Sequence, residues 1–219
     1  MAVESDGRLI SAGVAVVAAA NLVLFGSLVP ALLRRGAPFV PTARAKVDAL
    51  FGSGGILARG GVAEARGPVR ELRLIDLGSG DGSLLRGAAR AGYGHATGYE
   101  INPALVALSK AWPHRGTSTS TETRWGSMWE ADVSSADVIT CYGVPPIMER
   151  LGLKLRDELP AGAIICSNGY EVPLLGEPLA VRFIETSSWS PDASSHLFIY
   201  RAPGAGIDTP SRGTVRRGN

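Results

Sequence analysis

The chain has 219 residues, enough for one ordinary domain with additional segments. Its 22 basic and 20 acidic residues give a formal net charge of +2, too small to indicate a nucleic-acid partner from charge alone. Two cysteines and three histidines occur in none of the spacings typical of a disulfide framework or a metal centre. We therefore expect no metal site and interpret both cysteines as small core residues.

The N-terminal region differs in composition from the rest of the chain. Residues 9–33 contain no charged side chain, and at about 1.5 Å per helical residue they exceed the roughly 30 Å apolar core of a bilayer. We predict a transmembrane helix here, in an anchor or targeting segment over residues 1–35; a buried core helix is the less favoured alternative. Arg34 and Arg35 follow the run, which favours the cytoplasmic or matrix side for the rest of the chain.

Residues 36–70 are predicted to form a hinge and a short capping helix. Prolines bracket the hinge, and Thr42 is placed to cap an amphipathic helix. The apolar face of that helix is predicted to hold Val47, Leu50 and Phe51, and the polar face to hold Arg44, Lys46 and Asp48. Residues 58–70 are rich in glycine and arginine, which predicts a loop or frayed helix. A plain linker over the whole stretch is a strong alternative.

A glycine-rich turn follows the first predicted strand. Leu74, Ile75 and Leu77 form a buried strand, three glycines stand at alternate positions from 78 to 82, and residues 83–90 have a helical pattern. Such a turn places backbone N–H groups and a helix N-terminus around a small ligand. The pattern resembles motif I of class I S-adenosylmethionine methyltransferases. This resemblance implies cofactor-binding roles for one group of residues: Asp76, Gly78, Ser79, Gly80 and Asp81.

A second predicted strand ends in an acid about twenty residues after this turn. Residues 95–100 read as a strand, and Glu100 at its tip is placed to accept both ribose hydroxyls of a nucleoside cofactor. Ile101 beside it is placed to lie on the adenine face. The glycine turn and the acid together predict S-adenosyl-L-methionine as the cofactor.

Strands and helices continue to alternate after Glu100. A helix is predicted from Pro103, and a third strand ends near Ser127 and Met128, which are expected to contact the adenine. Residues 137–142 and 161–167 are further buried strands, and residues 181–188 and 196–201 form a closing hairpin. We predict an α/β class I methyltransferase fold over residues 71–202: a Rossmann-like seven-stranded sheet with a terminal antiparallel hairpin. Residues 203–219 are predicted to be disordered.

The end of the fourth strand is expected to face the transferable methyl group. Ligands of doubly wound sheets bind outside the carboxyl ends of the central strands, which points to Tyr142, Gly143 and Pro145 as catalytic residues. Amine-modifying DNA methyltransferases have an Asp/Asn-Pro-Pro-Tyr/Phe motif here. This chain lacks its first and last residues, which argues against a flipped base and any nucleic-acid partner. Trp129 and Tyr170 are candidate walls of the acceptor site.

The order of these motifs resembles one small family. Residues 38–42 (PFVPT), the glycine turn, residues 98–103 (GYEINP) and residues 142–148 (YGVPPIM) occur in the order found in mitochondrial protein-lysine methyltransferases that modify the ATP synthase c subunit and the adenine nucleotide translocase. The resemblance implies a membrane-protein substrate that presents a lysine, contact with the lipid bilayer, and a location at the mitochondrial inner membrane with the catalytic domain facing the matrix. Ser127 stands where that family usually has an aspartate.

Two other functions remain open at this stage. One is a membrane-anchored methyltransferase of lipids or small molecules, and the other is a catalytically inactive assembly factor that binds S-adenosylmethionine. The residues do not distinguish among the family's substrates.

Overall fold

The computed structural model of the protein describes residues 39–112, 119–186 and 196–203. The predicted membrane anchor at residues 1–35 and the tail from residue 204 onward lie outside the described residues. Across those described ranges, the structure has no helix that is both long enough and apolar enough to cross a membrane.

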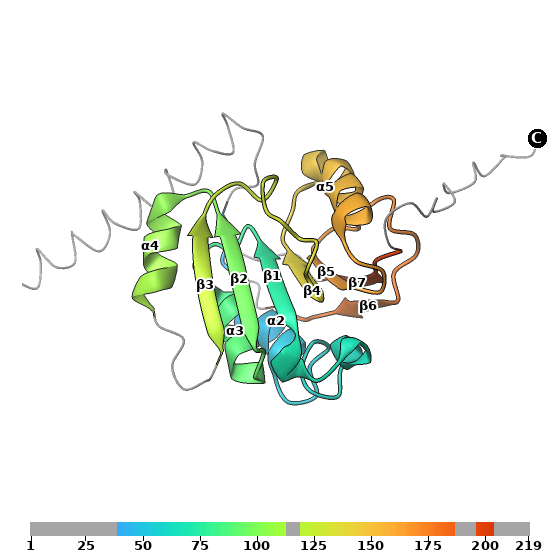
Figure 1. The fold of residues 1–219 in the computed structure, drawn as a ribbon, viewed down its shortest axis with the longest axis horizontal. Helices are drawn as coiled ribbons and strands as arrows, with labels where there is room; N and C mark the ends of the chain where they lie inside the picture. Colours follow the sequence, from blue (N-terminus) through green and yellow to red (C-terminus); the bar gives the residue numbers. More distant parts are fainter. Residues whose placement is uncertain (1–38, 113–118, 187–195, 204–219) are drawn as a thin grey trace, which may run out of the picture. The chain divides into compact units, whose positions relative to one another are not determined.

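One seven-stranded sheet organises the molecule, with strand order β3-β2-β1-β4-β5-β7-β6 (Figure 1). Strands β1 to β5 run parallel, while β7 is antiparallel to β5 and β6 is antiparallel to β7. This mixed sheet with a terminal hairpin confirms the predicted class I architecture. The strand bounds are β1 Arg73–Leu77, β2 His95–Glu100, β3 Ser120–Trp125, β4 Val138–Cys141, β5 Ile164–Asn168, β6 Ala180–Phe183 and β7 His196–Arg201.

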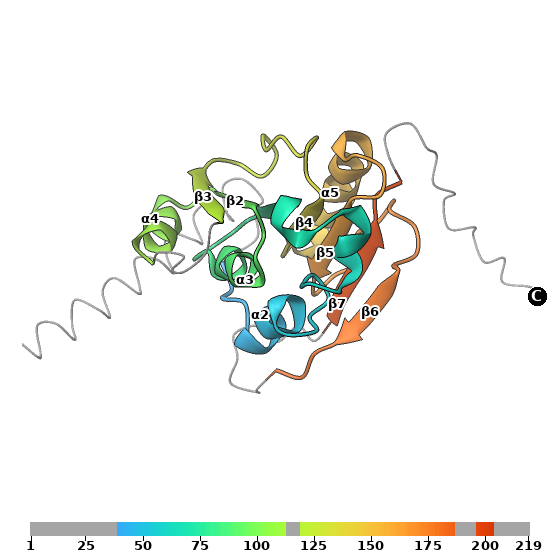
Figure 2. The same ribbon diagram turned by 60° about the horizontal axis from the view of Figure 1, so that its bottom comes forward.

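Four α-helices flank the sheet within the described residues, and α2 and α3 lie on the opposite face from α5 (Figures 1 and 2). Local sequence signals mark the first residues of two of these helices. Gly82, with φ of 79°, precedes α3, and Asn102 accepts a hydrogen bond from the Ala104 N–H at the start of α4. The helix bounds are α2 Arg44–Phe51, α3 Ser83–Ala91, α4 Pro103–Ala111 and α5 Pro145–Glu158.

Helix α2 contributes to the main hydrophobic core on the α3 face of the sheet. Its side chains Val47, Leu50 and Phe51 are buried, as their helical spacing predicts. The contact with α3 is close because Gly87 carries no side chain: a Cβ there would lie 2.5 Å from Cδ2 of Phe51. The core therefore begins well before β1.

Three details of residues 42–70 differ from the sequence-based expectations. Ala43, rather than Thr42, is the N-cap of α2, and no side chain caps that end. Lys46, expected on the polar face, is fully buried. Two 3-10 helices, η1 (Val62–Arg66) and η2 (Val69–Glu71), lie where a loop or frayed helix was predicted. Helix η1 is held because Arg66 donates both to Asp137 Oδ1 and to the Ala161 carbonyl, contacts too distant in sequence for a local pattern to reveal.

Candidate cofactor and acceptor site

Asp76 lies at the centre of a row of residues that share one face of the sheet. The strand register pairs Asp76 with Gly98 on β2 and with Thr140 on β4, and Thr140 pairs with Cys166 on β5. Thr140 Oγ1 donates to Asp76 Oδ1 at 2.8 Å. Burial raises the pKa of Asp76 to about 7 despite that hydrogen bond. A carboxyl in this state is receptive to a cationic partner, which would favour its ionised form.

The glycine turn is tied to the neighbouring strand by its backbone. The N–H groups of Gly78 and Ser79 both donate to the Tyr99 carbonyl, at 2.9 and 3.0 Å. Gly78 and Gly80 have φ of 83° and 54°, a conformation that L side chains rarely adopt. A Cβ on Gly78 would meet no atom within 4 Å, so open space lies beside the turn.

Glu100 joins the glycine turn to the tip of β2. Its Oε2 accepts from Gly80 N at 2.8 Å, and its Oε1 accepts from Asn102 N at 2.7 Å. Burial raises the pKa of Glu100, while these backbone donors oppose the shift by favouring the carboxylate. Each carboxylate oxygen can accept a second hydrogen bond. The glycine turn and the strand-end acid, predicted separately, are therefore in direct contact.

Two buried polar side-chain atoms in the described part of the chain have no hydrogen-bond partner: Ser79 Oγ and Asn102 Nδ2. Both belong to residues that flank the Gly80–Glu100 contact. An unpaired buried polar atom is costly, so a pair of them next to the glycine turn fits a polar ligand. Sequence reasoning did not single out Asn102, although an Asn-Pro step at a helix start is a recognisable capping signal.

Asp81 already has partners in this structure. Its Oδ2 accepts from Arg86 Nη2 at 3.0 Å and its Oδ1 accepts from Ser83 N at 3.0 Å, while Arg86 Nη1 also donates to the Asp81 carbonyl. These contacts brace the last part of the turn against the first turn of α3. The role of Arg86 was not predicted from the sequence, because a separation of five residues from Asp81 is not typical of any motif.

The segment after β3 lies next to Glu100, because Gly126 N donates to the Glu100 carbonyl at 3.0 Å. Ser127 and Met128, predicted to contact adenine, follow directly and are half-buried. Ser127 Oγ accepts from Trp129 N at 3.3 Å, so this side chain also shapes its own turn. Ile101 is half-buried at the same edge.

The predicted catalytic residues lie at the end of β4. Tyr142 is half-buried, and Pro145 is the exposed first residue of α5. Gly143 is buried, and a Cβ there would collide with Met148 Sδ, so a side chain at this position would require Met148 to move. Trp129 carries the Arg150 guanidinium 4.0 Å from its ring centroid, and Tyr170 is exposed.

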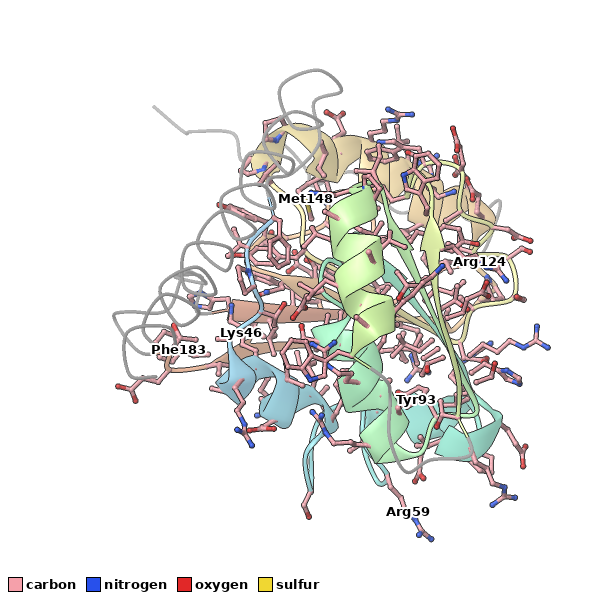
Figure 3. All side chains as sticks on the ribbon, turned by 90° about the vertical axis from the view of Figure 1, so that its left-hand side faces the viewer. Lys46, Arg59, Tyr93, Arg124, Met148 and Phe183 are labelled. Atoms are coloured by element: carbon pink, nitrogen blue, oxygen red, sulfur yellow. The ribbon has the colours of Figure 1, made fainter. Side chains whose placement is uncertain are left out.

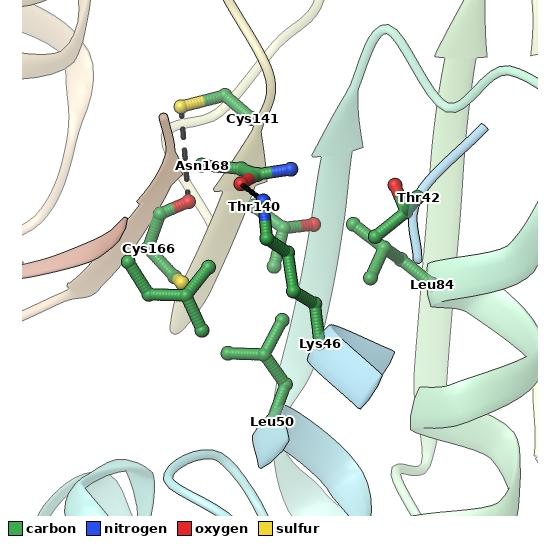
Figure 4. Close-up of a pocket in the computed structure, with 9 residues that line it drawn as sticks. Thr42, Lys46, Leu50, Leu84, Thr140, Cys141, Cys166 and Asn168 are labelled. Atoms are coloured by element: carbon green, nitrogen blue, oxygen red, sulfur yellow. Dashed lines mark hydrogen bonds between the residues drawn. The ribbon is translucent and has the colours of Figure 1, made fainter. Parts of the chain in front are cut away.

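A lysine that sequence reasoning assigned to a solvated face lies close to Tyr142. Lys46 Nζ donates to Asn168 Oδ1 at 2.6 Å and lies 5.8 Å from the Tyr142 ring centroid. Figure 3 shows Lys46 directed inward from α2, and Figure 4 shows its side chain reaching Asn168. The surrounding pocket is also lined by Thr42, Leu50, Leu84, Thr140, Cys141, Cys166 and Leu197.

The mixed sheet with five parallel strands, the glycine turn after β1 and the acid at the tip of β2 define a class I S-adenosylmethionine-dependent methyltransferase. A solved structure agrees with this class: an RNA methyltransferase from Salinibacter ruber, in complex with S-adenosyl-L-homocysteine, matches with a TM-score of 0.58 at 27% sequence identity. The match covers 78% of this chain and 98% of that chain.

Within this class, the chain belongs to the family of lysine N-methyltransferases named for the ATP synthase c subunit and the adenine nucleotide translocase. A family model described as the ANTKMT methyltransferase domain matches residues 76–177. The ATP synthase c-subunit lysine N-methyltransferase of Rattus norvegicus is 30% identical over 184 residues, 83% of this chain and 68% of the relative. The adenine nucleotide translocase lysine N-methyltransferase of Mus musculus is 34% identical over 114 residues, 51% of this chain and 49% of the relative. These findings confirm the family resemblance.

Proposed function

We propose that this protein is an S-adenosylmethionine-dependent protein-lysine N-methyltransferase whose substrate is a lysine of a mitochondrial inner-membrane protein. The observation that carries the proposal is the direct contact between Gly80 and Glu100 at 2.8 Å, beside buried Asp76 and within the family's matched region. The names of the relatives supply the substrate class: the c subunit of an ATP synthase or an adenine nucleotide translocase.

The proposed cofactor contacts follow from charge and hydrogen-bonding capacity. The Asp76 carboxylate would attract the cationic amino group, and the Glu100 carboxylate would accept the ribose hydroxyls. When bound, S-adenosylmethionine supplies a methyl group on a sulfonium. The residues around these two acids complete the proposed site: Gly78, Ser79, Gly80, Asp81, Ile101, Ser127 and Met128.

The proposed catalytic contribution of this chain is to position a neutral amine. A lysine side chain has an ordinary pKa of about 10.4, so it must lose a proton before its nitrogen can act as a nucleophile. Tyr142, Gly143 and Pro145 would shape the entrance at the end of β4. The absence of a side chain at Gly143 leaves the Met148 sulfur close to the backbone there. A well-aligned nucleophile and methyl lower the barrier to in-line transfer.

The proposed location follows from the uncharged run at residues 9–33. An anchor in the mitochondrial inner membrane would hold the methyltransferase domain, residues 71–202 with the segment before it, near the bilayer on the matrix side. The hinge at residues 36–42 is short, so tethering would raise the effective concentration of membrane-embedded substrates over soluble ones.

One labelling experiment tests the proposal against its alternatives. The full-length protein is incubated with methyl-labelled S-adenosylmethionine and mitochondrial membranes, and label is then measured in protein, lipid and RNA fractions. We expect label on lysines of membrane proteins, and much less label with the Glu100→Ala variant at a subsaturating cofactor concentration. Label in lipid would support the small-molecule alternative, and no label despite cofactor binding would support an inactive assembly factor. The RNA fraction is included because the Salinibacter ruber structure is that of an RNA methyltransferase.

Intact-mass analysis identifies the substrate. The ATP synthase c subunit and the adenine nucleotide translocase are compared from cells with and without this protein. Loss of a methyl-lysine mass increment from one of them would support the proposal. If both keep their increments and the purified enzyme labels soluble peptides equally well, the membrane-lysine assignment is wrong.

A further inference from the structure

Lysine is rare in this chain, and one of its lysines lies in an unusual place. The sequence has three lysines, Lys46, Lys110 and Lys154, among 22 basic residues. Lys110 is exposed on α4. The Lys154 side chain lies on α5, where its Nζ donates to the Ala131 carbonyl at 2.8 Å. Lys46, by contrast, has no exposed surface at all, and a fully buried lysine is uncommon unless its head group has a specific partner.

The Lys46 head group lies at the end of the sheet where the methyl acceptor is expected. Its partner Asn168 is the last residue of β5, and the Tyr142 ring follows β4 directly. The same pocket includes Thr140, whose hydroxyl is bonded to Asp76. Lys46 thus connects α2, which precedes the methyltransferase domain, to the carboxyl ends of the two central strands (Figure 4).

The titratable groups that face Lys46 come from three strands. The thiols of Cys141 and Cys166 line the pocket, and burial raises the pKa of both, so they are neutral at physiological pH. The Tyr142 phenol lies beside the head group, and the Asp76 carboxyl is one strand away, behind Thr140. The charge of Lys46 lowers the pKa of Cys166, an effect smaller than the increase caused by burial.

We propose that Lys46 provides a fixed positive charge that lowers the pKa of the substrate lysine and so keeps its amine neutral for methyl transfer. This inference rests on the proposed function. A neighbouring positive charge disfavours the protonated form of an amine, and the effect is larger in a dry pocket than in water. Lys46 is a positioning residue in this scheme: it exchanges no proton or methyl group, and it acts through its field and through its bond to Asn168.

The same charge affects the cofactor in a way that requires no acceptor. S-adenosylmethionine carries a sulfonium charge that S-adenosyl-L-homocysteine lacks. A positive charge at the acceptor end therefore weakens binding of the first ligand relative to the second. The ratio of the two affinities reports the Lys46 charge even if the true methyl acceptor differs from the proposed one.

The experiment compares three variants of the full chain with the wild type. Lys46→Met removes the charge and keeps the length of the side chain, while Lys46→Arg keeps the charge. Lys154→Met is the matched control, because it removes a mostly buried lysine from α5. Calorimetry at pH 8.5, where Asp76 is mostly ionised, should show the affinity for S-adenosylmethionine relative to S-adenosyl-L-homocysteine rising roughly threefold to tenfold in Lys46→Met only.

The pH dependence of lysine methylation supplies the second measurement. The rate rises with pH as the acceptor amine deprotonates, so loss of the Lys46 charge should shift this rise upward by about one pH unit. Lys46→Arg should retain the wild-type profile. If Lys46→Met does not fold, Lys46→Gln removes the charge and retains an N–H donor for Asn168.

Two outcomes would overturn the inference. One is a folded neutral variant with an unchanged affinity ratio, and the other is a neutral variant whose pH profile coincides with that of the wild type. A failure of the proposed function is distinguishable, because lysine methylation would then be absent from the wild type while the affinity ratio could still be measured.

Discussion

The Glu100 carboxylate binds two backbone N–H groups that belong to different elements, so its effect on cofactor binding is partly structural. Glu100→Gln places an NH2 group where one of these acceptors was, and that end of the amide then repels Gly80 N or Asn102 N. We expect the affinity for S-adenosyl-L-homocysteine to fall by one to two decades, about 1.5–3 kcal/mol. Calorimetry measures this, with exposed Glu122→Gln as the control. An unchanged affinity would remove Glu100 from the cofactor site.

The Asp76 carboxyl makes the cofactor-free protein sensitive to pH. Its pKa is raised from 3.8 to about 7, so between these values the folded state binds a proton that the unfolded state has lost. The free energy of unfolding should therefore fall as pH rises from about 4 to 7, by at most about 4 kcal/mol from this group. In Asp76→Asn this dependence should be much weaker, with only a smaller share left from Glu100, whose pKa is also raised.

Urea unfolding at pH 5 and pH 8 measures the Asp76 effect. Asp48→Asn is the control, because the Asp48 side chain is mostly exposed on α2. A pH dependence of equal size in Asp76→Asn and wild type would show that the carboxyl is already ionised in the folded protein.

The packing of α2 on α3 depends on the missing side chain of Gly87. An added Cβ would lie 2.5 Å from Phe51 Cδ2 and 2.9 Å from Val47 Cγ1, so one of the helices must move. Alanine favours helices over glycine by about 1 kcal/mol, and overpacking costs about 1–3 kcal/mol. The two opposing effects leave an expected loss of up to about 2 kcal/mol in the free energy of unfolding of Gly87→Ala. Denaturant unfolding tests this against Arg90→Ala, an exposed substitution on the same helix. A stabilised Gly87→Ala would mean that the helices separate freely.

Local patterns predicted most of the elements correctly. The buried strands β4 and β5 are short apolar runs, and Gly82 and Pro103 mark the starts of α3 and α4. Each of these sequence signals is contained within a few residues. The position of Lys46 was not predictable in this way. It precedes Leu50 by four residues and so borders the apolar stripe, where a lysine normally extends to solvent. Its burial depends on Asn168, which is 122 residues away in sequence.

The candidate site was predictable where it follows from topology. Parallel strands align their carboxyl ends, so Asp76, the glycine turn and Glu100 had to meet once the sheet was correct. The hydrogen-bond partners of individual atoms were less predictable, since the contact between Asp81 and Arg86 and the unpaired amide nitrogen of Asn102 depend on side-chain directions. The cofactor-binding and catalytic roles of all the site residues stay predictions.

The whole molecule extends further toward the N-terminus than the predicted methyltransferase domain at residues 71–202. The described residues from Val40 onward belong to one compact unit, and α2 and η1 supply part of its core. A chain that begins at residue 71 loses Val47, Leu50, Phe51 and Leu57, each worth about 1.5–3 kcal/mol when buried. That sum rivals the typical total stability of about 5–15 kcal/mol. We expect residues 71–203 to lack a cooperative thermal transition in circular dichroism, and residues 39–203 to show one. Cooperative unfolding of the shorter chain would show that a stable core does not require α2.

The two buried cysteines allow the opening of the sheet to be followed by thiol labelling. Cys141 and Cys166 are the only thiols in the sequence, they lie on the adjacent strands β4 and β5, and burial raises the pKa of Cys141 to about 12 and that of Cys166 further. A thiol-reactive probe should therefore leave the native protein unlabelled until the central strands separate, and then modify both sites together. Mass spectra taken over time should show zero or two adducts with little of the singly modified species. Saturating S-adenosyl-L-homocysteine should lengthen the delay, because a ligand of the folded state lowers the population of open molecules.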